Sequence, residues 1–393
     1  MTGAPLKLAV IAGEVSGDLL GGDLVAALHR KLGRPLDLVG VGGEALEAQG
    51  LRSLFDYSEL SIMGISQVLA RLPNLIRRIG QTADAIIAAR PDVLVIIDSP
   101  DFTHRVAKRV RKALPGLPVF NYVCPSVWAW KPERAPRMRA YVDHVLAVLP
   151  FEPAAMEALD GPETTYVGHR LASDRDLVAA RTANAARRAE AAETALRTCL
   201  ILPGSRASEI NRLLPIFGET MQELAGRNPG MRFLLPTVPK QEPLVRRITA
   251  GWELQPEITV GADAKWRAFA EADAAIAASG TVLLELALTG IPAISAYKVD
   301  WLVKLMAKRI TIWTAALPNL IADYPVIPEY VEIVRPGNLA RWVERLVADT
   351  SQRRAMIEGY DLVWQRMATQ EPPGEKAARV ILDLLDIKKP GQN

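Results

Sequence analysis

Residues 92–98 have the sequence DVLVIID, and this stretch does most to decide the fold. Its five central residues are all apolar, and Pro91 and Pro100 enclose it. A continuous apolar run of this length is typical of a strand buried on both faces of a parallel sheet. Helical patterns separate it from similar runs at 8–12, 36–41, 119–122 and 144–148. The sequence therefore predicts a doubly wound α/β domain.

A second series of strand-like runs follows, at 198–202, 232–235, 274–278 and 292–297. Residues 173–198, between the two series, are rich in Ala, Arg and Glu and have no strand pattern. We therefore expect Rossmann-like domains over 1–172 and 199–345, a polar helical connector over 173–198, and C-terminal helices over 346–393. These last helices are expected to pack back on the N-terminal domain. Two such domains facing a cleft carry their ligand-binding loops directly after strands.

Composition excludes several classes of protein. The 393 residues are 49% hydrophobic and 23% charged, as in an ordinary globular chain rather than a disordered or fibrous one. A net charge of +3 is too small to indicate nucleic acid as a partner. The two cysteines, Cys124 and Cys199, give neither a disulfide framework nor a zinc spacing and fit a reducing compartment. No apolar run reaches the ~18 residues of a membrane span, and the N-terminus has no signal-peptide pattern, so we expect a cytoplasmic location.

Two strand-ending loops of the first series carry candidate functional residues. Asp98 ends the run at 92–98, where a carboxylate is partly desolvated, as a general base requires; a helix cap is the alternative. The loop AGEVSGD at 12–18 combines two glycines with a helix start that suits an anion or sugar hydroxyls. The alternative for this loop is a tight βα turn capped by Ser16 or Asp18.

Two sequence motifs resemble known fingerprints without their required context. GVGGEA at 40–45 matches the dinucleotide pattern, but it follows the second strand, and no strand-ending acid stands ~20 residues on. We therefore interpret it as a glycine turn and keep a dinucleotide-dependent oxidoreductase as an alternative. Asp174-Arg175-Asp176 resembles a metal-binding DxD motif, but it begins a helix, where acids need no metal. The sequence thus predicts neither a metal nor another cofactor.

The segment CPSVWAWK at 124–131 follows another strand of the first series. Two tryptophans and the nearby basic residues could line a cleft or hold an anionic group; these basic residues are Lys131, Arg134, Arg137 and Arg139. Inter-domain packing of the tryptophans and a solvated basic helix face are the alternatives.

The second series has two loops that combine glycine, a hydroxyl group and a helix start. Their residues are Gly204, Ser205 and Arg206 in the first loop, and Ser279, Gly280 and Thr281 in the second. Helix dipoles and an arginine suit a diphosphate. Glu285 lies one turn into the second helix, where its carboxylate can accept hydrogen bonds from a ribose diol. Helix capping is the alternative for each loop.

These motifs, taken together and in this order, resemble one known family. AGEVSGD, GVGGEAL, SIMGISQVL, DSPDF, CPSVWAWK, PGSR, SGTVLLELAL and LPNLIA occur between residues 7 and 329. This order resembles that of lipid-A-disaccharide synthases, which are glycosyltransferases of the GT-B architecture. Cys124 stands where many members have serine.

The resemblance implies a substrate pair and a mechanism. The donor is UDP-2,3-diacylglucosamine and the acceptor is 2,3-diacylglucosamine 1-phosphate; the products are UDP and the β-1,6-linked lipid A disaccharide 1-phosphate. The transfer inverts the anomeric centre without a metal. Asp98 is the expected base, the two glycine loops hold the UDP diphosphate and Glu285 holds its ribose. The resemblance also places Asn319 in the cleft and Ser16, Gly17, Met63 and Gly64 on the acceptor side.

Lipid substrates imply peripheral contact with the cytoplasmic face of the inner membrane. Segments 62–79 and 301–321 combine apolar and basic residues, as interfacial helices do. The alternative for each is an amphipathic core helix, and 301–321 could instead form a homodimer contact. Competing functions are another GT-B UDP-sugar enzyme, such as a UDP-N-acetylglucosamine epimerase or a peptidoglycan glycosyltransferase, and a non-catalytic nucleotide-binding membrane adaptor.

Overall fold

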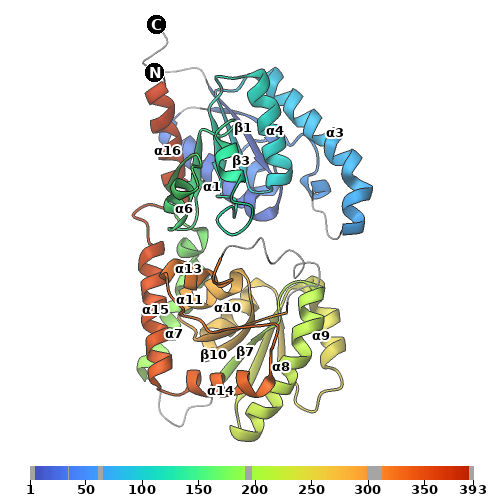
Figure 1. Ribbon diagram of the computed structural model, residues 1–393, viewed down its shortest axis with the longest axis vertical. Helices are drawn as coiled ribbons and strands as arrows, with labels where there is room; N and C mark the ends of the chain where they lie inside the picture. Colours follow the sequence, from blue (N-terminus) through green and yellow to red (C-terminus); the bar gives the residue numbers. More distant parts are fainter. Residues whose placement is uncertain (1–4, 34, 61–64, 191–196, 299–311, 389–393) are drawn as a thin grey trace. The chain divides into compact units, whose positions relative to one another are not determined.

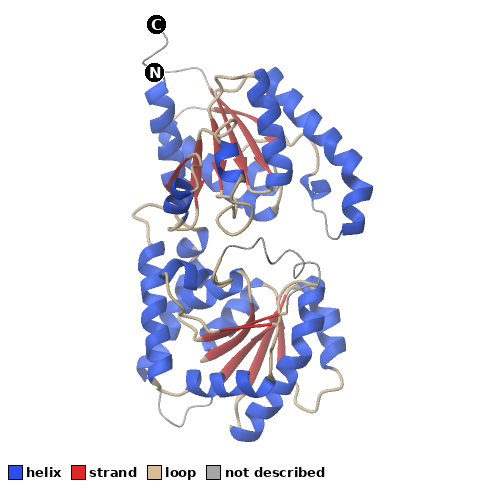
Figure 2. Cartoon of the chain, viewed as in Figure 1, coloured by secondary structure: helices blue, strands red, loops and turns tan. Residues whose placement is uncertain are grey.

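The computed structural model describes all residues except 1–4, 34, 61–64, 191–196, 299–311 and 389–393 (Figure 1). The chain forms two compact units: Met1–Arg170 with Thr369–Asn393, and Leu171–Ala368. Within the described residues each unit has a six-stranded sheet with helices on both faces (Figure 2). All strand pairs in these sheets are parallel. The expected α/β class is therefore confirmed.

The first sheet has the strand order β2-β1-β3-β4-β5-β6. Its strands are β1 (Leu6–Ala12), β2 (Leu36–Val41), β3 (Val93–Ile97), β4 (Val119–Tyr122), β5 (His144–Ala147) and β6 (Glu163–Tyr166). The helices of this unit are α1 (Val15–Leu32), α2 (Glu44–Glu47), α3 (Ile65–Ala89), α4 (Pro100–Ala113), α5 (Arg134–Met138), α6 (Glu152–Ala158) and α16 (Pro373–Lys388).

Both faces of the first sheet are apolar because its central strands are buried from both sides. All five residues of β3 are inaccessible to solvent. Along β1, Leu8 and Val10 pack in the core with α1 and α16, whereas Ala9 and Ile11 pack in the core with α3 and α4. Burying one such Leu or Ile contributes about 1.5–3 kcal/mol. These two cores hold the carboxyl ends of β1 and β3 in place.

The second sheet has the strand order β12-β11-β10-β7-β8-β9. Its strands are β7 (Thr198–Leu202), β8 (Arg232–Thr237), β9 (Glu257–Val260), β10 (Ala274–Ala278), β11 (Ala293–Tyr297) and β12 (Glu329–Val331). The α-helices of this unit are α7 (Arg175–Glu190), α8 (Ala207–Arg227), α9 (Glu242–Thr249), α10 (Ala262–Glu271), α11 (Thr281–Thr289), α13 (Leu317–Ala322), α14 (Pro336–Val347) and α15 (Ser351–Met367). Helices α7, α10, α11 and α15 form one packed group, and α8, α9 and α14 form another.

The expected connector helix and one of the expected C-terminal helices belong to the second unit. Helix α7 packs on α10 and α11 as part of the second unit, with Leu177 and Asn184 buried. The Asn184 amide donates to the carbonyls of Phe269 and Thr289, so this polar residue belongs to the packed interior. Helix α15 also belongs to the second unit, and only α16 packs on α1 of the first.

Each sheet has a point where the strand order reverses. In the first sheet it lies between β1 and β3, and in the second it lies between β7 and β10. Parallel α/β sheets bind ligands beyond the carboxyl ends of the strands at such points. The loops that follow these four strands are therefore the expected positions of ligand sites. Across the described helices, none combines the length and the apolar character that crossing a membrane requires.

Candidate functional site

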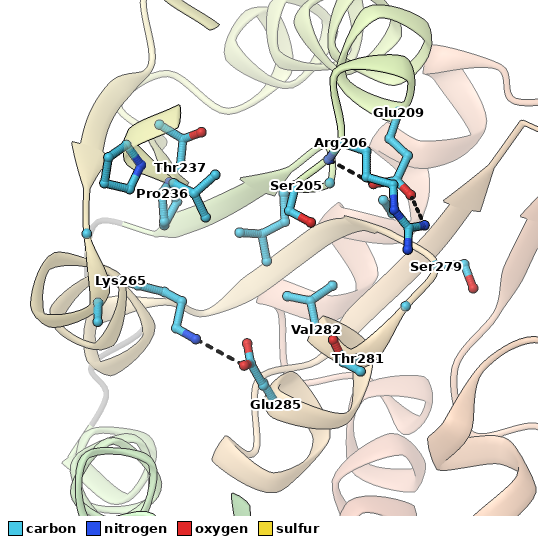
Figure 3. Close-up of a pocket in the computed structure, with 18 residues that line it drawn as sticks. Ser205, Arg206, Glu209, Pro236, Thr237, Lys265, Ser279, Thr281, Val282 and Glu285 are labelled. Carbon is cyan, nitrogen blue, oxygen red and sulfur yellow. Dashed lines mark hydrogen bonds and ion pairs between the residues drawn. The ribbon is translucent and has the colours of Figure 1, made fainter. Parts of the chain in front are cut away.

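A cavity of ≈ 570 Å³ lies at the switch point of the second sheet (Figure 3). Helices α8, α10 and α11 all begin at this cavity, and each is preceded by a glycine with positive φ. These glycines are Gly204 (φ 107°), Gly261 (φ 93°) and Gly280 (φ 158°). Helix N-termini offer unpaired N–H groups and a positive dipole end to an anion. Three such N-termini around one cavity suit a ligand with several anionic oxygens.

Gly204 is required by the contact between its loop and α8. A Cβ at this position would lie 2.4 Å from Oε2 of Glu209. Glu209 accepts hydrogen bonds from the backbone N–H of Arg206 (3.3 Å) and from its guanidinium Nη1 (3.1 Å). Its carboxylate therefore occupies the N-terminal turn of α8 and holds Arg206, whose side chain is 78% exposed. Arg206 lines the cavity and is accessible to a ligand.

An ion pair joins two of the helices that line the cavity. Nζ of Lys265, on α10, lies 3.0 Å from Oε1 of Glu285, on α11 (Figure 3). Lys265 also stands over the Trp266 ring, 4.1 Å from its centroid. Both charged groups are largely buried, at 29% and 16% side-chain exposure. The pair places one cation and one hydrogen-bond acceptor side by side on the cavity wall.

The structure brings together most of the residues that the sequence assigned to nucleotide-sugar binding. Seven line this one cavity: Gly204, Ser205, Arg206, Ser279, Gly280, Thr281 and Glu285. Their ligand contacts stay predictions. The sequence reasoning missed Glu209, Lys265 and the wall formed by Thr237, Val238 and Pro239.

Asn319 does not line this cavity, contrary to expectation. It is 1% exposed, and its amide is used inside the turn that follows α13. Its Oδ1 accepts from the N–H groups of Val326 (2.9 Å) and Ile327 (2.8 Å), while its Nδ2 donates to the Ile327 carbonyl (3.0 Å) and to Thr314 (3.1 Å). In this conformation Asn319 orders the turn and has no side-chain surface left for a ligand.

Asp98 lies at the switch point of the first sheet, directly after β3. It lines a second cavity, of ≈ 260 Å³, which we call the Asp98 cavity. Its backbone is left-handed (φ 50°), as is that of Ser99 (φ 45°), and its Oδ1 accepts from the Ser99 N–H (2.8 Å). The carboxylate therefore does not cap α4, which was the alternative expectation. Strained backbone of this kind is concentrated at functional sites.

The AGEVSGD loop packs closely against the end of β3. A Cβ on Gly13 would lie 2.5 Å from Oγ of Ser99, and one on Gly17 would lie 3.5 Å from the Ile97 carbonyl. Ser16 is exposed, whereas Gly17 is buried. Met63 and Gly64, the other expected acceptor-side residues, lie outside the described residues.

Asp18 joins this loop to the GVGGEA turn instead of capping its own helix. Its carboxylate accepts from the N–H groups of Gly43 (2.7 Å), Ala45 (2.8 Å) and Leu46 (3.2 Å). These are the amides that a pyrophosphate would need in a dinucleotide fold. Gly40 is required for a different reason, because a Cβ there would lie 1.8 Å from the Val10 carbonyl oxygen. The turn therefore serves close packing, and the structure gives no support to the dinucleotide alternative.

The two tryptophans of CPSVWAWK have different environments. Trp128 packs edge-on against Phe151, with ring centroids 5.0 Å apart, and its indole N–H donates to Glu152 (3.3 Å). Trp130 lines the Asp98 cavity. Glu152 is 2% exposed and also accepts from two backbone N–H groups. Burial nevertheless raises the pKa of Glu152 to about 7, with the hydrogen bonds from Leu149 and Trp128 opposing the rise.

The acids of the DxD-like motif are used by α7. Oδ1 of Asp174 accepts from the N–H groups of Asp176 (3.0 Å) and Leu177 (3.1 Å), which is a helix N-cap arrangement. The capping interpretation of this motif therefore accounts for Asp174. Nowhere in the described chain do three or more His, Cys, Asp or Glu side chains gather as a metal site would need.

The fold defines a class: two Rossmann-like units with parallel sheets, as in GT-B glycosyltransferases and related epimerases. Among solved structures, the Methanocaldococcus jannaschii UDP-GlcNAc 2-epimerase in complex with UDP-GlcNAc and UDP matches with a TM-score of 0.60 and 13% identity, over 96% of this chain and 100% of that one. The glycotransferase of kitacinnamycin matches with a TM-score of 0.59 and 17% identity, over 97% of this chain and 99% of that one. At these identities the likeness shows the fold alone.

Sequence relatives define the family. The lipid-A-disaccharide synthetase family model matches residues 8–358. A lipid-A-disaccharide synthase from Nitrobacter winogradskyi is 46% identical over 382 residues, which cover 96% of each chain. The chain therefore belongs to the lipid-A-disaccharide synthetase family. The expected enzyme class, a glycosyltransferase of lipid A synthesis, is confirmed, and the alternatives are not favoured.

Proposed function

We propose that the chain transfers diacylglucosamine from UDP-2,3-diacylglucosamine to the 6-hydroxyl of 2,3-diacylglucosamine 1-phosphate. The products are the β-1,6-linked lipid A disaccharide 1-phosphate and UDP. The observation that carries this proposal is the cavity of the second unit, with three glycine-preceded helix N-termini and the side chains of Arg206 and Lys265.

In this proposal the second unit binds the donor in its cavity of ≈ 570 Å³, which we call the donor cavity. The N–H groups at the start of α8 and α11 hold the diphosphate and stabilise the negative charge that develops on it as the sugar leaves. Arg206 moves from Glu209 to the phosphates, since its side chain is exposed and its partner lies at the same helix end. Glu285 accepts hydrogen bonds from the ribose hydroxyls, and Lys265 keeps its carboxylate oriented.

Asp98 of the first unit acts as the general base. It takes the proton from the acceptor 6-hydroxyl, whose oxygen attacks the anomeric carbon of the donor from the face opposite to UDP. The anomeric centre is therefore inverted in one displacement. A pre-formed left-handed backbone and the hydrogen bond from the Ser99 N–H orient the carboxylate before substrate arrives. General bases of this kind contribute about 10²- to 10⁴-fold in rate.

Acylated substrates require access to a membrane surface, and we propose a peripheral location on the cytoplasmic face of the inner membrane. In the described part of segment 62–79, Ile76 is 56% exposed and Arg77 beside it is also exposed. An apolar and a basic side chain next to each other suit an anionic lipid surface. Arg78 is less available, because it pairs with Glu59 and stacks over Phe55. In the described part of segment 301–321, Trp313 is 55% exposed.

A UDP-release assay with both lipid precursors in detergent micelles tests this function. We expect release that depends on the acceptor, and a product in which the 6-hydroxyl carries the new β-linkage. UDP release without acceptor would favour hydrolysis, and conversion of the donor to an epimer would favour an epimerase. Chelation with EDTA is expected to leave the rate unchanged; strong inhibition would show that the reaction uses a metal ion.

A further inference from the structure

A third cavity, of ≈ 340 Å³, adjoins the Asp98 cavity in the first unit. We call it the basic cavity because five cationic side chains line it: Arg105, Lys108, Lys131, Arg134 and Arg137. Two carboxylates, those of Asp101 and Glu133, also line it. The lining is therefore strongly cationic overall, although the whole chain carries a net charge of only +3.

The five cations differ from the other arginines on and beside helices α4 and α5. Arg109 pairs with Asp84, Arg111 with Asp143, and Arg139, directly after α5, with Asp160. In the described part of the chain, none of the five cavity cations forms an ion pair with a carboxylate. The arginines outside the cavity are thus paired, whereas those inside it are not; Lys112, near the end of α4, lies outside the cavity. The unpaired charges converge on one hollow, as an anion site requires.

Aromatic rings hold two of these cations in place. Nζ of Lys108 stands over the Tyr141 ring, 4.8 Å from its centroid, and Nζ of Lys131 stands 5.3 Å from that of Trp130. Lys131 itself has a left-handed backbone (φ 55°). Along with Asp98, Ser99 and Val123, it makes four of the eight non-glycine residues with positive φ in the described chain. Strained backbone is thus concentrated around the two adjoining cavities.

The two cavities share His104, Pro100 and Arg134. His104 is 5% exposed, and its Nε2 lies 3.2 Å from Oδ1 of Asn121, which can only accept, so Nε2 carries the proton. Its Nδ1 then accepts from the Tyr141 hydroxyl (3.0 Å). Burial, helped by the nearby charge of Arg134, lowers the pKa of His104 to about 4. The wall between the cavities is therefore a neutral imidazole with a cation beside it.

We propose that the basic cavity binds the phosphate monoester of the acceptor while the Asp98 cavity receives the hydroxyl that reacts. The identity of this acceptor rests on the proposed function. A glucosamine 1-phosphate carries its phosphate on C1 and its 6-hydroxyl on the carbon attached to C5, and C1 and C5 both flank the ring oxygen. Two adjoining cavities, one cationic and one containing a carboxylate, match these two neighbouring groups. The basic cavity thus sets the orientation in which the acceptor presents its 6-hydroxyl to Asp98.

Paired double variants on the same two helical segments test this assignment. Lys108→Gln with Arg137→Gln removes two cavity cations, and Arg109→Gln with Arg139→Gln removes two cations that lie outside the cavity at the same net charge. Steady-state UDP release is measured with the phosphorylated acceptor and with its phosphate-free counterpart. We expect the cavity variant to raise the acceptor KM by about tenfold per cation with the phosphorylated acceptor only, because charge-assisted hydrogen bonds to phosphate are lost. The outer variant should change neither KM.

Equal effects on both acceptors, or equal effects of the two double variants, would overturn the proposal. A wild-type chain that releases no UDP from the lipid precursors would count against the proposed function instead. The phosphate site is then tested without turnover, by calorimetric titration with glucosamine 1-phosphate and with glucosamine. Binding of the phosphate ester that is lost in the cavity variant supports the site, and equal binding of both compounds refutes it.

Binding to lipid headgroups is the competing source of the same chemistry. Vesicles of phosphatidylglycerol and phosphatidylethanolamine measure it directly, because the two double variants have the same net charge. If the cavity variant loses vesicle binding while its acceptor KM in micelles stays unchanged, the cavity serves the membrane and the proposal fails. Arg134→Lys keeps the charge at the shared wall and is expected to retain most phosphate binding, so loss of packing and loss of charge are distinguished.

Discussion

The switch points of the two sheets have the same topology and opposite chemistry. In the second unit, β7 and β10 lead into glycine-preceded helix N-termini, which suit a bound anion. In the first unit, β1 and β3 lead into a close-packed loop and a strained aspartate. In the proposed function, the same backbone framework supplies a leaving-group site in one unit and a base in the other. The difference comes from a few residues at the strand ends.

The two units also differ in their buried titratable groups. The first unit contains Glu152, with a pKa raised to about 7 by burial, and His104 and His169, with pKa values lowered to about 4 by burial. Among the described residues of the second unit, burial raises the pKa of the Cys199 thiol well above its usual range, away from neutrality. We therefore expect the first unit to carry the pH sensitivity of the protein and the second to bind its ligand independently of pH near neutrality.

The largest expected effect concerns the base. Asp98→Asn keeps the shape of the side chain and removes its basicity, so transfer should fall by about 10³-fold. UDP affinity, measured by titration calorimetry, should stay unchanged because Asp98 does not line the donor cavity. Asp92→Asn is the matched control at the other end of the same run, where Asp92 accepts from the Lys7 N–H (2.9 Å). A rate for Asp98→Asn within a few-fold of the control would remove Asp98 from the base role.

The sequence predicted the interior strands of both sheets and one edge strand, β2. The runs at 36–41, 119–122, 198–202 and 274–278 coincide with β2, β4, β7 and β10. The other edge strands, β6 (ETTY), β9 (EITV) and β12 (EYV), were missed, because an outer strand has no need of a continuous apolar run. Because the sequence did not predict β9, it also did not predict that Gly261 and Lys265, which follow this strand, form one wall of the donor cavity.

The two glycine loops were singled out by residue type alone, and the structure places both at one cavity; their binding of an anion stays a prediction. The conformation of Asp98 was not, since no sequence pattern specifies a left-handed aspartate, and a cap on α4 was an equally good interpretation. Asn319 shows the same limit of sequence-based prediction. A polar residue in a turn can bind a ligand or the turn itself, and the five side-chain hydrogen bonds of Asn319 show that it binds the turn.

The second prediction concerns the pH dependence of stability in the first unit. The pKa of Glu152 is about 7 in the folded chain, against 4.5 for a glutamate exposed to solvent. Its contribution to stability is therefore fully present below pH 4.5 and is lost as pH rises through 7. At ~1.4 kcal/mol per pKa unit, the free energy of unfolding should shift between wild type and Glu152→Gln by about 3 kcal/mol across this window. Urea unfolding at several pH values measures it.

Glu157→Gln is the matched control for this experiment, because Glu157 lies on the same helix α6 and is exposed. His104 contributes in the opposite direction, since its stabilising effect is lost as pH falls from 6.5 to about 4. His104 is present in the wild type and in both variants, so its effect cancels when their free energies of unfolding are compared. Parallel pH profiles for wild type and Glu152→Gln would show that Glu152 is ionised in the fold.

The third prediction concerns the glycine loop of the donor cavity. Gly204→Ala places a Cβ against Glu209 at a left-handed φ, so it should destabilise the fold by about 2 kcal/mol and weaken UDP binding. Gly226→Ala, near the end of α8 in open space, should instead stabilise by about 0.5 kcal/mol. Thermal unfolding and UDP titration compare the two. If both alanines shift the midpoint in the same direction, the close contact at Gly204 does not limit the loop.

The smallest effect separates a ribose contact from a purely structural ion pair. Glu285→Gln keeps a hydrogen-bond acceptor but loses the charge that pairs with Lys265, so the donor KM should rise about fivefold while the acceptor KM stays unchanged.

A donor with 2′-deoxyuridine in place of uridine tests the ribose contact more directly. The wild type should prefer the ribose donor, because the Glu285 carboxylate is left without its partner when the hydroxyl is absent. In Glu285→Gln this preference should shrink. Glu242→Gln, which breaks an exposed pair with Arg246 on α9, controls for charge in the same unit. If Glu285→Gln raises the KM for both donors equally, Glu285 acts only by holding α10 against α11, and the ribose lies elsewhere in the cavity.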